Sequence, residues 1–155
     1  MKIGSIIEDL KFERRVAITP EIAKKFINDG FEINLQKNYA KHLGFEDRDY
    51  EAFNVKIFDN EKLVYENSEV LTQLNLPSKH NLENINQNKV LVGILNPYQN
   101  KKELDELVKN KINCFSLELL PRITRAQSMD VLSSQANLAG YKAVVESFGN
   151  FEKAI

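Results

Sequence analysis

The chain has 155 residues, of which 43% are hydrophobic and 28% charged, and its formal net charge is −1. This length is enough for one sizeable core, and the composition is that of an ordinary globular protein. The near-zero net charge supplies no basic patch that would attract nucleic acid or anionic lipid, so we expect neither as a partner. The longest apolar run, at 89–95, is far shorter than the roughly 20 residues of a membrane span, so no direct membrane insertion is expected.

Three further features narrow the class of protein. The N-terminal residues mix acids and bases too early for a secretory signal, which predicts a cytoplasmic location. Cys114 lies in an apolar, strand-like run with no histidine near it in sequence, so an inert buried thiol is favoured over a nucleophile. His42 and His80 are isolated from each other and from any carboxylate cluster, so no metal site is predicted.

Short apolar runs alternate with amphipathic segments along the chain. Several of these runs are apolar on both faces, which is typical of a parallel sheet covered by helices. The alternation predicts right-handed βαβ units in an α/β fold, with a Rossmann-like or flavodoxin-like parallel sheet and helices on both faces. The strands are expected at 2–7, 31–36, 55–58, 70–75, 89–95 and 113–119.

The clearest helix signal begins at Thr19, a candidate N-cap, continues with Pro20 at the first helical position, and stops at Gly30. The polar and apolar pattern predicts further helices at 46–53, 60–67 and 101–111.

The last segment behaves differently, because nothing from about Gln127 to Ile155 resembles a strand. A long C-terminal helix leading out of the domain is expected there, longer than the average of about 11–12 residues. We therefore predict an N-terminal Rossmann-like catalytic domain at 1–126. Residues 127–155 are predicted to form an interdomain helix leading to an NAD-binding Rossmann domain that this sequence lacks.

Several well-known catalytic signatures are missing. No G-x-G-x-x-G follows a strand and no G-x-x-x-x-G-K-[ST] occurs, so a complete dinucleotide site is not expected within the chain. The sequence also lacks G-x-S-x-G, a Cys–His pair and C-x-x-C. Two polar stretches remain as candidate sites.

The first candidate is the loop "FERRVAITP" at 12–20, which leads into the first helix. Arg14 and Arg15 offer planar guanidinium groups that can clamp a carboxylate. A solvated arginine pair beside Glu13 is the favoured interpretation on sequence alone.

The second candidate is the polar stretch at 120–144. Gln127, Asp130, Ser133 (or Ser134) and Asn137 recur every three or four residues, so they are expected along one side of a helix start. A solvated capping turn explains part of this pattern, since Ser128 can cap the helix and the helix dipole favours Asp130.

Capping does not account for the amide side chains Gln127, Gln135 and Asn137, nor for Arg122 and Arg125 beside the turn. Hydrogen-bond donors and acceptors with little net charge suit a carboxamide or a ribose better than a phosphate. On chemistry alone, both a capping turn and a ligand site stay open.

The same residues carry a family likeness. "RVAITPEIAKKF" at 15–26 and "LPRITRAQSMDVLSSQANLAGYKAV" at 120–144 together resemble the alanine dehydrogenase and proton-translocating nicotinamide nucleotide transhydrogenase family, and the likeness covers essentially the whole chain. The second motif resembles the transhydrogenase α-subunit branch in particular. The resemblance implies the N-terminal domain of a two-domain NAD(H)-binding component, with the glycine-rich turn in the second domain.

The resemblance also implies roles for individual residues. Arg122 and Asp130 would orient the nicotinamide end of NAD(H), and Ser133 would hydrogen-bond its carboxamide. Gln127 would reach toward the NADP(H) bound by a partner component. Direct hydride transfer needs the two rings about 3–3.5 Å apart, and the protein supplies orientation rather than a general acid or base.

Partners follow from the same resemblance. They would be the NADP(H)-binding and membrane components of the transhydrogenase, which couple hydride transfer to proton translocation, and a second copy in a homodimer. The chain would then be peripheral to the inner membrane through these partners. By itself it should bind NAD(H) weakly and show no turnover.

Two alternatives stay open. An alanine- or saccharopine-dehydrogenase-like enzyme would need a lysine where this chain has Gln73 or Asn75, and a histidine where it has Asn96; only Arg15 matches that branch. These departures favour the transhydrogenase branch. The other alternative is a non-catalytic interaction domain that dimerises through the helix at 128–148.

Overall fold

The chain is described by a computed structural model that defines residues 1–151. It forms two compact units, Met1–Ser116 and Leu117–Ile155. The functional division predicted at residues 126 and 127 concerns a second domain that this chain lacks, and it stays a prediction.

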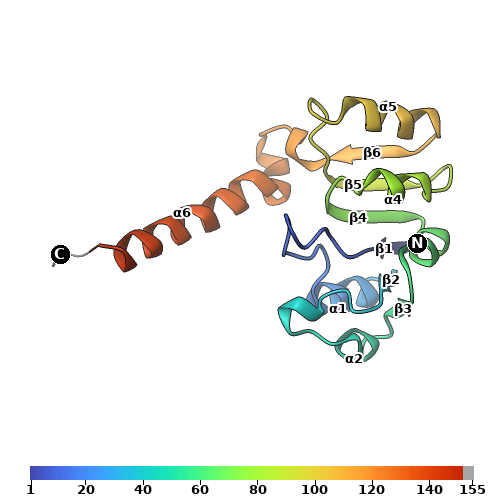
Figure 1. Cartoon of the computed structure of the whole chain (residues 1–155), viewed down its shortest axis with the longest axis horizontal. Coiled ribbons are helices and arrows are strands. Elements are labelled where there is room, and N and C mark those ends of the chain that lie inside the picture. Colours follow the sequence, from blue (N-terminus) through green and yellow to red (C-terminus); the bar gives the residue numbers. More distant parts are fainter. Residues whose placement is uncertain (152–155) are drawn as a thin grey trace. The chain divides into compact units, whose positions relative to one another are not determined.

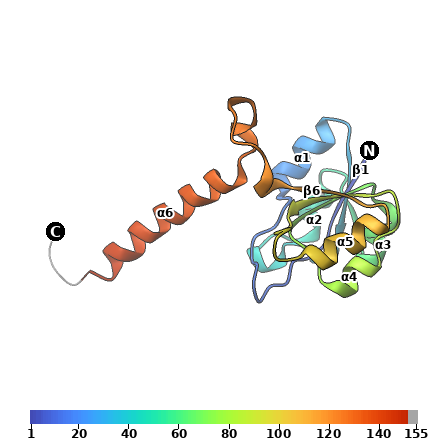
Figure 2. The same ribbon diagram turned by 90° about the horizontal axis from the view of Figure 1, so that it is seen from above.

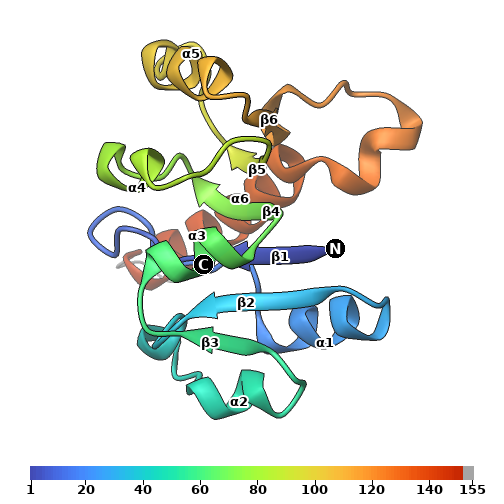
Figure 3. The ribbon, with the colours of Figure 1, turned by 90° about the vertical axis from the view of Figure 1, so that its right-hand side faces the viewer.

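The first unit contains a six-stranded parallel sheet with the strand order β3-β2-β1-β4-β5-β6, which can be followed in Figure 1 and Figure 3. This order is that of the Rossmann fold, whereas flavodoxin-like sheets run 2-1-3-4-5, so the structure selects the Rossmann-like arrangement of the two predicted. All six predicted strands are present: β1 Lys2–Ser5, β2 Glu32–Gln36, β3 Lys56–Phe58, β4 Val70–Asn75, β5 Val90–Ile94 and β6 Asn113–Ser116.

Helices cover both faces of this sheet, as predicted. One core contains Ala23 and Tyr50 from the first two helices, and the other contains Val64, Leu82 and Leu107 from the next three. Figure 2 shows α1 on one side of the sheet and α4 and α5 on the other. The α-helices of the unit are α1 Pro20–Asn28, α2 Asp47–Glu51, α3 Glu61–Asn67, α4 Lys79–Glu83 and α5 Lys101–Lys109, and a 3₁₀ helix, η1, spans Lys41–Leu43.

The start of α1 is as predicted: the side chain of Thr19 accepts a hydrogen bond from the N–H of Ile22, and Pro20 begins the helix. Two helices, α4 and η1, were not predicted, since helices of five and three residues are too short to show a periodic apolar face.

The second unit contains the 3₁₀ helices η2 Leu117–Leu119 and η3 Thr124–Met129 and the long helix α6 Val131–Gly149. Residues 117–119 were predicted to extend the last strand, and this is wrong because the chain turns at Leu117, whose carbonyl accepts the N–H of Leu120. The predicted helix end at 152–155 lies outside the described residues. Within residues 1–151, no helix combines the length and apolarity needed to cross a membrane.

The start of the long helix differs from the prediction. It begins at Val131 rather than near Gln127, and Asp130 rather than Ser128 caps it, because the Asp130 side chain accepts the N–H of Ser133. Gln127 and Ser128 therefore lie in η3, one turn before the helix.

Candidate functional site

The four residues predicted to face the nicotinamide line one cavity within the second unit. Arg122, Gln127, Asp130 and Ser133 surround a volume of about 350 Å³, which we call the α6-entry cavity. Its apolar and hydroxyl lining comes from Ile123, Thr124 and Ala126. The η3 turn explains this convergence, because it folds Gln127 back toward the first turn of α6.

Asp130 and Ser133 are held together at the helix start. The Asp130 carboxylate accepts the backbone N–H of Ser133 at 3.0 Å through Oδ1 and the Ser133 hydroxyl at 2.6 Å through Oδ2. These hydrogen bonds, aided by the nearby charge of Arg122, keep the pKa of Asp130 below its usual value. The ionised carboxylate thus fixes the hydroxyl of Ser133 as a donor to Asp130, and the lone pairs of Ser133 remain available to a ligand.

Other polar residues of this stretch do not join the α6-entry cavity. The hydroxyl of Ser134 donates to the carbonyl of Val131 within α6, and Asn137 and Arg125 are exposed outside the cavity lining. The predicted face that included Asn137 is therefore wrong in part, because η3 separates Gln127 from the helical repeat.

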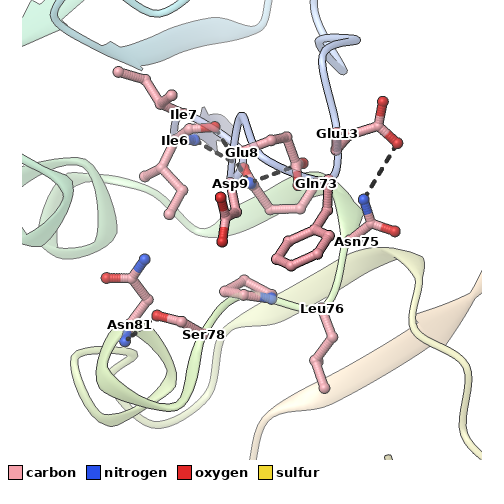
Figure 4. Close-up of a pocket in the computed structure, with 12 residues that line it drawn as sticks. Ile6, Ile7, Glu8, Asp9, Glu13, Gln73, Asn75, Leu76, Ser78 and Asn81 are labelled. Carbon is pink, nitrogen blue, oxygen red and sulfur yellow. Dashed lines mark hydrogen bonds between the residues drawn. The ribbon is translucent and has the colours of Figure 1, made fainter. Parts of the chain in front are cut away.

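A second cavity lies in the first unit, at the carboxyl ends of β1 and β4 (Figure 4). The chain leaves β1 toward β2 and leaves β4 toward β5, so these two neighbouring strands form the topological switch point, where α/β sheets commonly bind ligands. We call this volume of about 490 Å³ the switch-point cavity. Its lining residues are Ile6, Ile7, Glu8, Asp9, Phe12, Glu13, Gln73, Asn75, Leu76, Pro77, Ser78 and Asn81.

A buried hydrogen-bond chain supports the floor of the switch-point cavity. The hydroxyl oxygen of Tyr39 accepts the N–H groups of Ala17 and Ile18 at 3.1 and 3.3 Å, so its proton is directed to Ser5, 2.8 Å away. The Ser5 hydroxyl in turn donates to Oε1 of Gln73 at 2.8 Å. Burial raises the pKa of Tyr39 to about 12, so this phenol stays protonated and the chain keeps its direction.

Gln73 ends this chain and fixes the end of β1. Its side-chain amide pairs with both backbone groups of Ile6: Oε1 accepts the N–H at 2.7 Å and Nε2 donates to the carbonyl at 3.2 Å. Nε2 also donates to Glu8 at 3.1 Å, and the N–H of Leu74 donates to the same carboxylate oxygen at 2.6 Å. Burial raises the pKa of Glu8 despite these donors.

Arg15, the residue that matches the dehydrogenase branch, is bound within the chain. Its Nε and NH2 groups donate to the two carboxylate oxygens of Glu13 at 2.8 and 2.6 Å. Asn75 donates to Glu13 as well, at 3.3 Å. These bonds, with that of Arg15 the strongest, lower the pKa of Glu13 to about 2. The fork of Arg15 is thus engaged by a carboxylate of its own loop, as the favoured interpretation of Glu13 and Arg15 anticipated.

The remaining candidate groups are placed as follows. Cys114 is half-buried in β6, and burial raises the pKa of its thiol, which argues against a nucleophile. Across the part of the chain that the structure describes, no three histidine, cysteine or acidic side chains converge as a metal site requires.

The switch-point cavity was not predicted from the sequence. A signal for it was present, since Glu8 and Asp9 follow the first strand directly and Asn75 ends the fourth. The order of the strands, however, is needed to show that these two ends are neighbours.

Comparison with known proteins agrees with this fold. The model of the family "Alanine dehydrogenase/PNT, N-terminal domain" matches residues 5–139. The first part of a split NAD(P) transhydrogenase subunit alpha, from Rickettsia prowazekii, is 36% identical over 99% of this chain and 41% of its own length. The crystal structure of a transhydrogenase from Sinorhizobium meliloti superposes with a TM-score of 0.91 at 31% identity, over 99% of this chain and 46% of that one.

An alanine dehydrogenase from Halomonas elongata is more distant, at 23% identity over 99% of this chain and 41% of its own length. The chain thus spans less than half the length of these relatives. The family model covers most of the chain and the transhydrogenase relatives cover nearly all of it. The chain therefore belongs to the alanine dehydrogenase/PNT N-terminal domain family.

Proposed function

We propose that the chain is the first domain of the NAD(H)-binding component of a nicotinamide nucleotide transhydrogenase, and that the α6-entry cavity orients the nicotinamide of NAD(H). The observation that carries this proposal is the convergence of Arg122, Gln127, Asp130 and Ser133 on one cavity. These residues belong to the stretch that most resembles the transhydrogenase branch.

The hydrogen-bonding pattern of the cavity suits a carboxamide. Asp130 and Ser133 present acceptors, because the only hydroxyl proton of Ser133 is donated to Asp130. Arg122 presents donors only. A carboxamide carries an NH₂ group for the acceptors and a carbonyl for the guanidinium, so this arrangement favours one rotation of the group over the other.

Orientation is the contribution that hydride transfer requires from this chain. NAD(H) and NADP(H) supply the hydride chemistry, and the reaction proceeds when their nicotinamide rings are about 3–3.5 Å apart. Asp130 and Ser133 would fix the carboxamide, and Gln127, which is exposed, would contact the NADP(H) of a partner component. No general acid or base is needed.

Partners belong to the same proposal. They would be the NADP(H)-binding component and the membrane components that couple the reaction to proton translocation, which would hold this domain at the membrane surface. A homodimer is also proposed. The exposed side chains of Leu138, Tyr141, Val145 and Phe148 on α6 support burial of this helix in the assembled protein.

The amino-acid dehydrogenase alternative receives less support. Such an enzyme must hold a substrate carboxylate, but Arg15 is engaged by Glu13, and the switch-point cavity is lined by the carboxylates of Glu8, Asp9 and Glu13. The relatives named alanine dehydrogenase are also the more distant ones.

The test is hydride transfer in a complete enzyme. This chain would replace the corresponding residues of the Rickettsia prowazekii subunit, which would be combined with its NADP(H)-binding partner. We expect Asp130→Asn and Gln127→Asn each to lower the rate of hydride transfer from NADH to an NADP analogue at least tenfold, because small displacements of reacting groups cost up to about 100-fold. Ser147→Ala, which alters an exposed hydroxyl on α6, is the matched control. Unchanged rates in both site variants would support the non-catalytic interaction domain instead.

A further inference from the structure

We propose that the switch-point cavity binds a small organic cation, namely an amine with a short apolar body. The cavity is made entirely by residues of the first unit. This site goes beyond the nicotinamide-orienting role proposed above and does not depend on it.

The position and size of the cavity are those of a ligand site. It opens between the loop that follows β1 and the loop that follows β4, at the switch point of the sheet. Its volume of about 490 Å³ is within the range of small-molecule pockets. The two loops are held in place by side chains, since Gln73 binds Ile6 and Asn75 binds Glu13.

Acceptors outnumber donors in this cavity. Asp9 uses Oδ1 for the N–H of Lys11, which leaves Oδ2 for a ligand. Asn75 gives its NH₂ group to Glu13, which leaves its carbonyl oxygen. In Figure 4, Asp9 faces Ser78 and Asn81 across the cavity.

The charge of the lining selects a cation. Glu8, Asp9 and Glu13 contribute three carboxylates, and none of the described residues that line the cavity is a lysine, arginine or histidine. Arg15 neutralises Glu13 but does not belong to the lining. A carboxylate ligand would be repelled by the remaining charge, whereas an ammonium group would donate up to three hydrogen bonds to it.

The apolar side chains of the lining make an organic cation a better fit than a metal ion. Ile6, Ile7, Leu76 and Pro77 line the cavity beside the polar groups, so a short alkyl chain can be buried there. Among residues 1–151, no three metal-ligating side chains converge, and hard cations such as Ca²⁺ need six to eight oxygen ligands.

The test is an NMR titration of the whole isotope-labelled chain with propylammonium chloride. Sodium propionate and 1-propanol, matched in size and measured at equal ionic strength, are the comparison ligands. We expect propylammonium alone to produce saturable shifts in the amides of residues 8–13 and 75–81.

Two variants localise the effect. Asp9→Asn removes the charge and keeps the acceptor for Lys11, and it should weaken propylammonium binding about fivefold, as expected for a charge-assisted hydrogen bond at a partly exposed site. Asp105→Asn makes the same change on the exposed surface of α5 and should leave the binding constant as it is. Equal responses to propionate or propanol, no saturable shift in these loops, or unchanged binding in Asp9→Asn would each overturn the proposal.

Discussion

Replacing Gln73 by methionine should destabilise the first unit strongly. Gln73 is only 4% exposed and makes four hydrogen bonds, one with Ser5, two with the backbone of Ile6 and one with Glu8. Methionine has a similar volume but offers no amide partner, so Ser5 and the backbone of Ile6 lose their buried contacts. At about 1 kcal/mol per hydrogen bond, the expected loss is about 3–4 kcal/mol of a total stability of about 5–15 kcal/mol.

Urea unfolding followed by far-UV circular dichroism measures this loss. For a slope near 2 kcal/mol/M, the midpoint should fall by about 1.5–2 M, with the slope itself unchanged. Gln99→Met is the matched control, because Gln99 is exposed and its substitution should change the stability by less than about 0.5 kcal/mol. If Gln73→Met loses less than about 1 kcal/mol, the amide of Gln73 does not hold the end of β1 as described.

Three further perturbations test the fold. Gly93→Ala should lower the unfolding free energy by about 1–3 kcal/mol, since an added Cβ would lie 2.5 Å from the carbonyl oxygen of Gln73; urea unfolding measures this, and an unchanged midpoint would contradict it. Lys111→Gly should raise it by about 0.5–1 kcal/mol, because Lys111 has a φ of 58° in the left-handed region; thermal unfolding should show a higher midpoint. The folded-state pKa of Glu13 is lowered to about 2, so the stabilisation from its pair with Arg15 is present above pH 4.5 and is lost as the pH falls toward 2. Glu13→Gln should therefore reduce the stability difference between pH 5 and pH 2.5, by up to about 2 kcal/mol since Arg15 is half-exposed; an identical pH dependence in both proteins would refute this.

The sequence predicted the sheet well because its signals are local. Apolar runs such as 89–95 mark strands buried on both faces, and Thr19 with Pro20 marks a helix start. The strand order was beyond these signals, because a run of apolar residues fits several positions in a parallel sheet. The order followed only from the pairing of β1 with both β2 and β4.

The candidate sites were predicted unequally. Asp130 and Ser133 were found because they are three residues apart and lie in a motif with a family likeness. The cap was assigned to Ser128, since serine and aspartate are both good caps and only the geometry distinguishes them. Gln73 appeared only as a departure from a motif, because its partners Ser5 and Ile6 lie more than 60 residues away in the sequence.

The central claim, that the α6-entry cavity orients a nicotinamide, is tested most directly by titrating the labelled chain with nicotinamide and following the amide resonances by NMR. We predict weak, saturable shifts at Gln127, Asp130 and Ser133, and their loss in Ser133→Ala with the remaining spectrum intact. The absence of saturable shifts at these residues, or the same shifts and affinity in Ser133→Ala, would contradict it.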